Sequence, residues 1–236
     1  MREAKKIIFI VLVTVLLLGC SKKSSEKFNY GTIEYNGKIW MDRNLGAKEA
    51  CKSLEGNNAC WGNIYQWGRP SDGHEQRRSK ITELRDRSCN TYLDSSFVIM
   101  VMNINSDKNL KEIYQANWYS KCDEPQSSLW SSQGDGINEV CPIGWHVATK
   151  DDFESAKIKD AKDAFKKLKL TLGGIRQGIE VKHYTGEILA AGLMGRYWTA
   201  TIAQNGSIVS YDIDQVSFVE NKMRSINGAS VRCVKN

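Results

Sequence analysis

Four residues that could carry out proton transfer crowd one short stretch of the chain. Arg69, Asp72, His74 and Glu75 offer an anion binder, acids and a base within a single loop-like segment. Such spacing is compatible with general acid–base catalysis, in which a positioned carboxyl or imidazole moves a proton. It is equally compatible with a turn in which Asp72 and Arg69 brace the neighbouring backbone. The residues alone leave both interpretations open.

No other stretch carries a recognised catalytic or metal-binding pattern. The sequence has no G-x-S-x-G, no H-E-x-x-H, no phosphate-binding glycine loop and no C-x-x-C. His74, His146 and His183 are far apart, and no Cys/His pair has zinc-like spacing. We therefore expect no cofactor. Calcium is a minor alternative, for which two pairs offer oxygen ligands: Asp135 with Asn138, and Asp212 with Asp214.

Seven tryptophans offer a second kind of chemistry, the stacking of aromatic faces on sugars. Four of them lie in segments that we expect to pack the core: Trp40, Trp67, Trp145 and Trp198. Trp61, Trp118 and Trp130 lie in loop-like segments and are the candidates for an exposed ligand-binding surface. Arg69, Asp72 and His74 are the other candidate ligand-binding residues. Calcium-dependent lectins carry Glu-Pro-Asn or Gln-Pro-Asp and a Trp-Asn-Asp triplet, and neither occurs here.

The first residues have the pattern of an export signal. Arg2, Lys5 and Lys6 precede residues 7–18, which are apolar except for Thr14. That run is shorter than the roughly 20 residues of a membrane-spanning helix and suits a signal-peptide core. Residues 17–20 (LLGC) resemble the lipobox of bacterial lipoproteins, which implies cleavage after residue 19 and lipidation of Cys20 with diacylglycerol and an acyl chain such as palmitate. An uncleaved anchor or a plain secretory signal is the alternative.

The residue after the lipobox cysteine indicates to which bacterial membrane the lipoprotein is sorted. An Asp at that position resembles the inner-membrane retention signal of Gram-negative lipoproteins, whereas this chain has Ser21. We therefore expect an outer-membrane lipoprotein, facing the periplasm or the cell surface. Residues 1–19 are then the signal peptide, residues 20–27 a polar lipidated tether, and residues 28–236 a single domain.

Six cysteines remain after Cys20 is set aside: Cys51, Cys60, Cys89, Cys122, Cys141 and Cys233. An even number in an oxidising compartment predicts a disulfide framework, although six cysteines allow fifteen connectivities. Cys51 and Cys60 flank a short polar loop, so we expect them to pair. Cys89 and Cys122 bracket an insertion-like segment.

The charge balance argues against a nucleic-acid partner. Lys and Arg exceed Asp and Glu by 33 − 27 = 6, and by 30 − 26 = 4 once residues 1–19 are removed. That excess is mild, and nucleic acid is an implausible partner outside the cytoplasm. Two clusters concentrate the basic residues: Arg77, Arg78 and Lys80, and Lys166, Lys167 and Lys169. We interpret them first as solvated faces and second as contacts to anionic lipid or polysaccharide.

The elements that must position these residues form an α+β pattern. Residues 32–41 predict a hairpin around Asn36 and Gly37, and residues 97–102 a buried strand or helix segment. Thr149 is a helix N-cap with Asp152 three residues on, and one prominent helix is expected near residues 150–168. A short helix is expected over residues 109–119. Strands are expected over residues 170–177, 197–203, 207–213, 215–219 and 229–234, with a second Asn-Gly hairpin signal at residues 205–206.

Several segments together resemble the Fibrobacter succinogenes major paralogous domain family. They are residues 36–46 (NGKIWMDRNLG), 65–70 (YQWGRP), 72–74 (DGH), 141–149 (CPIGWHVAT), 197–201 (YWTAT) and 230–234 (SVRCV). They occur in the family's order and span about residues 28–236. The family usually has Pro where this chain has Ala148, and residues 76–130 are more idiosyncratic.

The resemblance implies a fold and a function. The family is distantly similar to C-type lectins and formylglycine-generating enzymes, which implies an irregular mixed fold of mostly antiparallel strands, long loops and disulfides, and favours a Cys141–Cys233 bond. It also favours bracing by residues 69–75, because that segment recurs as a family motif. No cysteine here matches the reactive cysteines of the related oxidase. The leading hypothesis is a lipid-anchored envelope protein that binds a glycan, or an envelope or host protein, without catalysis. An enzyme of the related group and a purely structural envelope protein are the alternatives.

Overall fold

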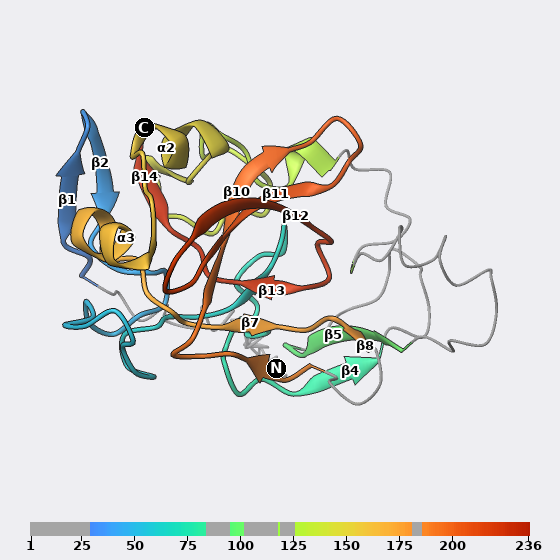
Figure 1. Cartoon of the computed structure of the whole chain (residues 1–236). Helices are drawn as coiled ribbons and strands as arrows, with labels where there is room; N and C mark the ends of the chain where they lie inside the picture. Colours follow the sequence, from blue (N-terminus) through green and yellow to red (C-terminus); the bar gives the residue numbers. More distant parts are fainter. Residues whose placement is uncertain (1–28, 84–94, 102–117, 119–125, 181–185) are drawn as a thin grey trace, which may run out of the picture.

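Short strands and long connections make up most of the part of the chain that the structure describes. This computed structural model describes residues 29–83, 95–101, 118, 126–180 and 186–236. Within them the strands are mostly antiparallel, with two α-helices, so the fold is α+β and mainly β (Figure 1). The α+β expectation is therefore confirmed. The predicted helix over residues 109–119 falls outside the described residues except for Trp118.

The N-terminal hairpin joins a sheet that is completed from distant parts of the sequence. Its strand order is β1 (Thr32–Tyr35), β2 (Lys38–Met41), β14 (Cys233–Lys235) and β6 (Trp145–Val147). Asn36 and Gly37 have φ of 53° and 75° and form the two-residue turn between β1 and β2. Both residue types tolerate positive φ, so the Asn-Gly signal predicts this hairpin correctly.

Three further sheets occur in the described part of the chain. One is the antiparallel series β10 (Gly195–Ile202), β11 (Ile208–Ile213) and β12 (Phe218–Met223). The second has the order β3 (Tyr65–Gln66), β13 (Gly228–Ala229), β7 (Ile175–Arg176) and β9 (Ile188–Leu189). The third pairs β4 (Ile81–Glu83), β5 (Phe97–Val101) and β8 (Ile179–Glu180) in parallel. The strands predicted over 197–203 and 207–213 are confirmed as β10 and β11, and residues 97–102, left open between strand and helix, contain the strand β5.

The predicted helix near residues 150–168 is in fact two helices, α2 (Lys150–Ser155) and α3 (Ala161–Leu168). The expected capping box at Thr149 and Asp152 is present and starts α2. The chain leaves the helical path at Lys157, whose φ is 47°. Asp160 then caps α3 by accepting a hydrogen bond from the backbone N–H of Asp163. A second N-cap inside an apolar-periodic stretch explains why periodicity alone predicted one helix.

Two main groups of buried side chains hold these elements together. Phe153 of α2 lies at the centre of the first group and contacts the rings of Trp40, Tyr211 and Phe218. The second group is built from large aromatic side chains near β3, β10 and the connection after η1 (Gln126–Ser128): Tyr65, Trp67, Trp130 and Trp198. Each aromatic residue removes 150–250 Å² from water, so these clusters supply much of the burial available to a loop-rich domain.

Two disulfides link the described cysteines. Cys51 pairs with Cys60, as the short polar loop between them predicts, and Cys141 pairs with Cys233, as the family resemblance favours. The second bond ties the start of the 142–144 turn to β14, across 92 positions of sequence. Cys20, Cys89 and Cys122 lie outside the described residues. None of the helices in the described ranges has the length and hydropathy needed to cross a membrane.

Candidate functional site

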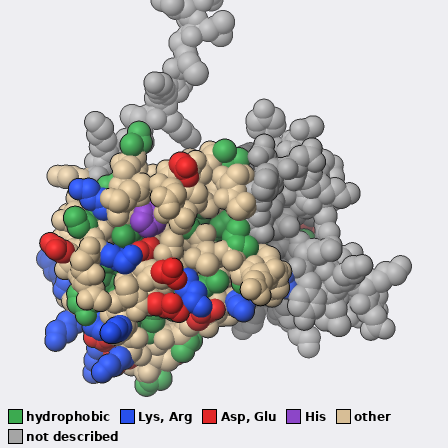
Figure 2. Space-filling model, turned by 90° about the horizontal axis from the view of Figure 1, so that it is seen from above, with side chains coloured by type: hydrophobic (Ala, Val, Ile, Leu, Met, Phe, Trp, Pro, Cys, Tyr) green, Lys and Arg blue, Asp and Glu red, His purple; other side chains and the backbone are tan. Residues whose placement is uncertain are grey.

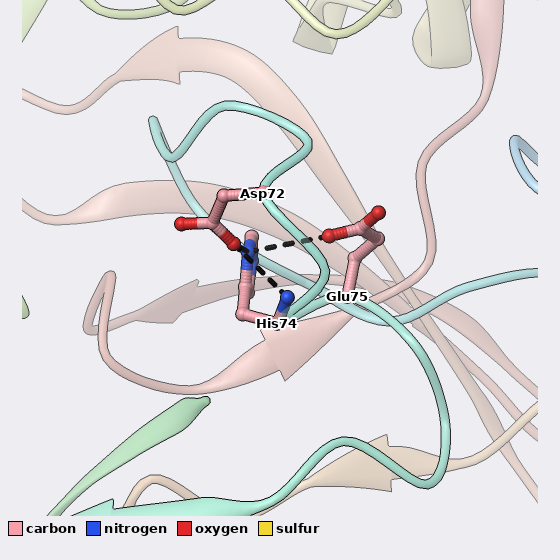
Figure 3. A group of neighbouring side chains, drawn as sticks. All are labelled: Asp72, His74 and Glu75. Atoms are coloured by element: carbon pink, nitrogen blue, oxygen red, sulfur yellow. Dashed lines mark hydrogen bonds and ion pairs between the residues drawn. The ribbon is translucent and has the colours of Figure 1, made fainter. Parts of the chain in front are cut away.

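The segment after β3 brings the four candidate acid–base residues together, and Figure 3 shows three of them, Asp72, His74 and Glu75. Asp72 receives an ion pair from Arg69, with Nε 2.8 Å from Oδ2, and a contact from His74, with Nδ1 2.7 Å from Oδ1. Glu75 approaches the same ring nitrogen at 3.5 Å from Oε2. His74 and Arg69 are completely buried, and Asp72 is half-buried. The structure therefore brings these residues together, but two of the candidate ligand-binding residues, Arg69 and His74, have no exposed surface.

The protonation of His74 follows from its two neighbours. Nε2 lies 3.0 Å from the backbone nitrogen of Gln66, which can only donate, so Nε2 must accept. The ring proton is then on Nδ1 and is donated to Asp72. Burial lowers the pKa of His74 to about 4, against the opposing effect of the bond to Asp72. His74 is thus a neutral imidazole with both nitrogens occupied.

A metal ion does not fit this cluster well. Asp72, His74 and Glu75 each point one ligand atom to a common region, with these atoms within 4.8 Å of one another. A metal on Nδ1 would displace the only ring proton, because Nε2 is already committed as an acceptor of the Gln66 N–H. Metal-bound histidines instead donate their second N–H. Occupation would therefore require an imidazolate or the loss of a buried hydrogen bond.

Arg69 extends the cluster into the core and fixes the loop to its surroundings. Its Nη1 donates to the Gln66 side-chain oxygen and to the Ser96 carbonyl, both at 2.8 Å. Gln66 in turn donates to the carbonyls of Val98 and Ile226. These bonds tie β3 to β5 and to the segment before β13. These contacts are the ones that the bracing interpretation expects, because each polar atom named here bonds backbone or another side chain of the cluster.

The structure separates the three tryptophans predicted to be exposed. Trp130 is 1% exposed, so that prediction is wrong for it. Its indole donates to the Asn138 carbonyl at 3.0 Å, and its ring contacts Trp67, with centroids 5.5 Å apart. Of the four expected in the core, Trp40, Trp67 and Trp198 are buried, while Trp145 is only half-buried.

Trp118 and Trp61 are both half-buried. Trp118 donates from its indole to the Trp67 carbonyl at 2.6 Å, and the Arg69 guanidinium lies 5.9 Å from its ring centroid. Its neighbours in sequence lie outside the described residues. Trp118 therefore lies against Arg69 at the edge of the acid–base cluster.

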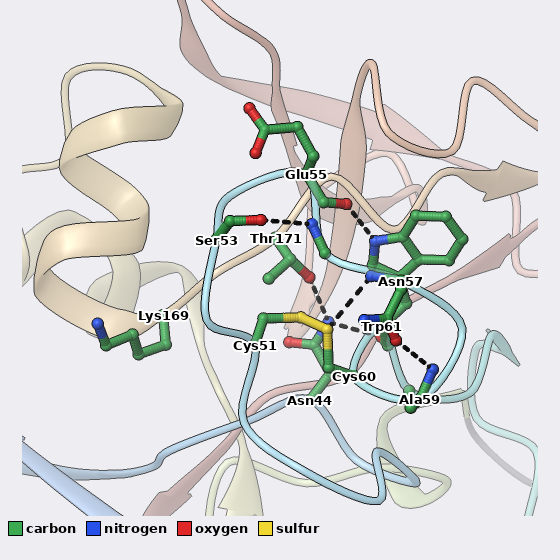
Figure 4. The surroundings of a disulfide bond; sticks show 12 residues. Asn44, Cys51, Ser53, Glu55, Asn57, Ala59, Cys60, Trp61, Lys169 and Thr171 are labelled. Atoms are coloured by element: carbon green, nitrogen blue, oxygen red, sulfur yellow. Dashed lines mark hydrogen bonds between the residues drawn. A yellow bond between two sulfur atoms is a disulfide. The ribbon is translucent and has the colours of Figure 1, made fainter.

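Trp61 stands at the edge of the Cys51–Cys60 loop (Figure 4). Its indole donates to the Glu55 carbonyl at 2.6 Å, so the ring orientation is fixed by the loop that the disulfide closes. Arg77 lies over the ring, with its guanidinium carbon 5.0 Å from the centroid. Arg77 also donates to the Gly173 carbonyl at 2.7 Å, and burial lowers its pKa to about 10. Arg77 is thus not part of a solvated face, contrary to the first interpretation of its cluster.

The oxygen-rich pairs considered for calcium have other partners. Asp135 accepts from the Ser131 hydroxyl, and Asn138 donates its side-chain amide to the Gly68 carbonyl. Asp212 pairs with Arg196, and Asp214 accepts the backbone N–H groups of Val216 and Ser217 in the β11–β12 turn. These interactions are those of turn and ladder residues, so neither pair presents a set of unoccupied oxygens.

A second histidine cluster was missed by the sequence reasoning. His146 of β6 contacts Asn236 Oδ1 through Nδ1 at 2.7 Å and Asp152 Oδ2 through Nε2 at 3.1 Å. Lys38 of β2 reaches the other Asp152 oxygen at 2.5 Å. Burial lowers the pKa of His146, but the bonds to Asp152 and Asn236 outweigh it and raise the pKa above its ordinary value. Since both ring nitrogens face oxygen acceptors, this histidine is a charged clasp rather than a base.

The only local signal for this clasp was the capping residue itself. Asp152 was predicted to cap α2, and its carboxylate does so while also binding Lys38 and His146. Burial raises the pKa of Asp152, but these partners together lower it well below its usual range. Lys38 and Asn236 lie 114 and 84 positions away from it, by the difference of residue numbers, and no local pattern connects them.

Comparison of the chain with known proteins identifies no relative. No family model, no curated protein and no solved structure matches the chain.

Proposed function

We propose that this protein is a lipid-anchored bacterial envelope protein whose domain binds a ligand without transforming it. Two features support the location. Residues 17–20 have the lipobox pattern, and the domain is held by two disulfides, which form and persist in oxidising compartments. In this proposal Cys20 carries the lipid, the outer membrane holds the anchor, and the domain faces the periplasm or the cell surface.

Binding is favoured over catalysis because the candidate acid–base groups are already occupied. His74 accepts from Gln66 and donates to Asp72, while His146 contacts acceptors at both nitrogens. A general base needs a free lone pair within hydrogen-bond reach of the substrate proton. Neither histidine offers one, so the alternative of an enzyme has little support among the described residues.

The finer assignment of the fold belongs to the same proposal. We propose a C-type-lectin-like domain of the Fibrobacter paralogous type. Its support is the order of the family-like segments, several of which form buried parts of the domain, including Trp40, Trp67 and Trp198. The long-range Cys141–Cys233 bond and the loop-rich middle of the chain are also consistent with it.

The observation that carries the ligand proposal is Trp61. It is a half-buried aromatic residue whose indole N–H is fixed on Glu55 and whose loop is closed by Cys51–Cys60. Arg77 supports one face of the ring. Next to it, Asn57 and Asn58 are exposed amides. A rigid aromatic ring beside amide groups suits a glycan, because the ring stacks on sugar C–H groups while amides bond the hydroxyls.

Glycan and protein arrays probed with residues 28–236 test this proposal. We expect binding to at least one envelope, host or polysaccharide ligand, and a loss of at least tenfold in affinity for Trp61→Ala. Trp145→Ala is the matched control, because Trp145 is also half-buried but lies outside this loop. Equal losses in the two variants would place the binding site elsewhere. Absence of any ligand on every array would favour the purely structural role.

The anchor is tested separately by metabolic labelling with palmitate. We expect label in the wild-type chain and in outer-membrane fractions, and none in Cys20→Ala. Incorporation of label into the Cys20→Ala protein would contradict the assignment of the lipidated residue.

A further inference from the structure

Lysine side chains cover one side of the domain around α3. Lys157, Lys159, Lys162 and Lys166 are all exposed, and we call these four residues the basic face. Lys and Arg side chains gather at the lower left of Figure 2, the side of the molecule on which Figure 1 shows α3 beside β1 and β2. Of these four, only Lys166 belongs to a basic cluster named in the sequence analysis. Lys157 and Lys159 come from the turn between α2 and α3.

The two carboxylates within residues 156–169 are engaged in interactions of α3 itself. Asp160 is used as the N-cap of α3, and Asp163 pairs with Lys167, with Nζ 2.7 Å from Oδ2. Residues 156–169 contain six lysines and two aspartates, so their net charge is 6 − 2 = +4. That equals the +4 of residues 20–236 as a whole. The excess positive charge of the domain is therefore concentrated on one helix and the turn before it.

The basic face lies beside the strand through which the chain enters the domain. Phe165 of α3 and Tyr35 of β1 join the same buried group, and the Lys167 ammonium lies 5.6 Å from the Tyr35 ring centroid. Cys20 lies twelve positions before Thr32, the first residue of β1. Even a fully extended chain of that length reaches only about 40 Å. A lipid on Cys20 would therefore hold β1 and α3 near the membrane surface.

We propose that the basic face docks on the anionic phospholipid headgroups of the membrane that holds the anchor. This inference rests on the proposed lipidation of Cys20. Each lysine close to an anionic membrane surface strengthens association by about fivefold. The anchor and the basic face would then act together, and the domain would adopt one orientation in which α3 faces the headgroups.

The composition of the face favours a lipid surface over a polysaccharide chain. Its four charges are compact, exposed ammonium groups, which interact as point charges with an array of phosphates. Recognition of a single polysaccharide chain generally adds aromatic stacking, and Phe165, the aromatic residue of α3, is half-buried with the Lys169 ammonium 4.5 Å from its ring centroid. Trp61, the aromatic candidate for a glycan, is a separate site.

The experiment uses the full chain, purified with its lipid and reconstituted into vesicles. Residues 22–27 are replaced by an uncharged recognition site for a specific protease, so that the anchor can be cut after the domain has reached the membrane. Flotation is measured before and after cutting, on vesicles of phosphatidylcholine alone and of phosphatidylcholine mixed equally with phosphatidylglycerol. We expect the cut domain to leave the neutral vesicles, to stay on the anionic ones, and to leave those in about 1 M salt, where the Debye length is about 3 Å.

Two charge variants sharpen the measurement. The first replaces the basic face with glutamine: Lys157→Gln, Lys159→Gln, Lys162→Gln and Lys166→Gln. The matched control removes four exposed charges elsewhere: Arg78→Gln, Lys80→Gln, Lys222→Gln and Lys235→Gln. We expect the first variant to bind anionic vesicles at least a hundredfold more weakly after cutting, and the control to remain within about tenfold of the wild type.

The possible failures are distinguishable. A chain that does not float with neutral vesicles before cutting contradicts the anchor, whatever the basic face does. A cut wild-type domain that leaves both kinds of vesicle overturns the docking proposal while the anchor stands. Capture of that released domain by soluble dextran sulfate would assign the basic face to a polysaccharide instead. Equal losses in the two variants would also overturn the proposal, since they would show a general charge effect.

Discussion

Buried arginines take the place of ladder hydrogen bonds at several points of this loop-rich chain. Arg232 is completely buried and donates to the carbonyls of Met41, Leu168 and Lys169. Arg176 and Arg77 hold other loop carbonyls, among them those of Gly186 and Gly173. Burial lowers the pKa of all three to about 10, so they remain charged at neutral pH. A guanidinium offers five donors, which suits loops whose carbonyls lack strand partners.

Replacing Arg232 by lysine tests this role at a single residue. Lysine keeps the charge but cannot span the separate carbonyls that the planar fork reaches, so buried acceptors lose their donors. We expect Arg232→Lys to lower the free energy of unfolding by about 3 kcal/mol in urea titrations. Arg78→Lys, at an exposed position, should change it by less than about 0.5 kcal/mol. Equal stability of the two variants would argue against a stabilising role for the hydrogen bonds of Arg232.

The depressed pKa of His74 predicts a dependence of stability on pH. The folded pKa is about 4 and the unfolded value about 6.5, so between these values the unfolded chain binds a proton that the folded chain does not. The free energy of unfolding should therefore fall as the pH drops from 6.5 to 4, by about 3 kcal/mol from this residue alone. Urea titrations across that range measure it.

His74→Gln is the control for this pH effect. Glutamine can still accept from the Gln66 N–H but does not titrate, so the variant should be less stable at pH 7 and show a shallower slope between pH 6.5 and 4.5. His146 acts in a different window, because its raised pKa makes its contribution disappear as the pH rises above about 6.5. If the free energy of unfolding had the same pH dependence in the wild type and in His74→Gln, the assignment of His74 as a buried neutral imidazole would be contradicted.

At the scale of elements, local sequence signals predicted where a hairpin turn and a helix begin, but not where the predicted helix breaks. The Asn36-Gly37 turn and the Thr149 cap act within a few residues, and both are confirmed. The break between α2 and α3 was missed, because Ala156 and Ala161 fit an apolar helical period on either side of it. The break depends on the competing cap at Asp160 and on a left-handed residue at Lys157, and periodicity does not report either.

The left-handed conformation of Lys157 gives a prediction for this break. A side chain at φ 47° is strained by roughly 1 kcal/mol, which glycine does not experience. Lys157→Gly should therefore raise the free energy of unfolding by about 0.5–1 kcal/mol. Lys166→Gly, inside α3, should lower it by about 1 kcal/mol. Thermal and urea unfolding of the two variants measures these two changes in the free energy of unfolding, which should have opposite signs. Destabilisation by both substitutions would contradict the left-handed conformation of Lys157 at the break.

At the scale of the whole molecule, contacts between distant segments decide which predicted site residues are accessible. Trp130 lies among glycine, serine and asparagine, a composition typical of exposed loops. It is nevertheless buried because its loop folds over Trp67, which comes from a segment 63 positions earlier by residue number. The acid–base cluster was predictable because its members are neighbours in sequence. The His146 clasp was not, because Lys38, Asp152 and Asn236 meet only after the sheets have formed.

The two disulfides should contribute unequally to stability. In the chain-entropy model the contribution grows with the loop that is closed, and the sequence separations are 92 for Cys141–Cys233 and 9 for Cys51–Cys60. We expect the double variant Cys141→Ala/Cys233→Ala to lose about 4–5 kcal/mol and Cys51→Ala/Cys60→Ala about 2–3 kcal/mol. Unfolding under non-reducing conditions measures both. A larger loss for the short loop would show that native strain, rather than chain entropy, dominates.

The central position of β14 between β2 and β6 has a kinetic consequence. The bond from Arg232 to the Met41 carbonyl joins positions 191 residues apart, so the sheet that receives the N-terminal hairpin closes a very long loop. Domains dominated by such non-local contacts fold in milliseconds to seconds, far more slowly than helical bundles. The β1–β2 hairpin must therefore wait, with Trp40 uncovered, until residues 233–235 join it. If the chain is exported unfolded, as we propose, this sheet can close only after residues 233–235 have crossed the membrane.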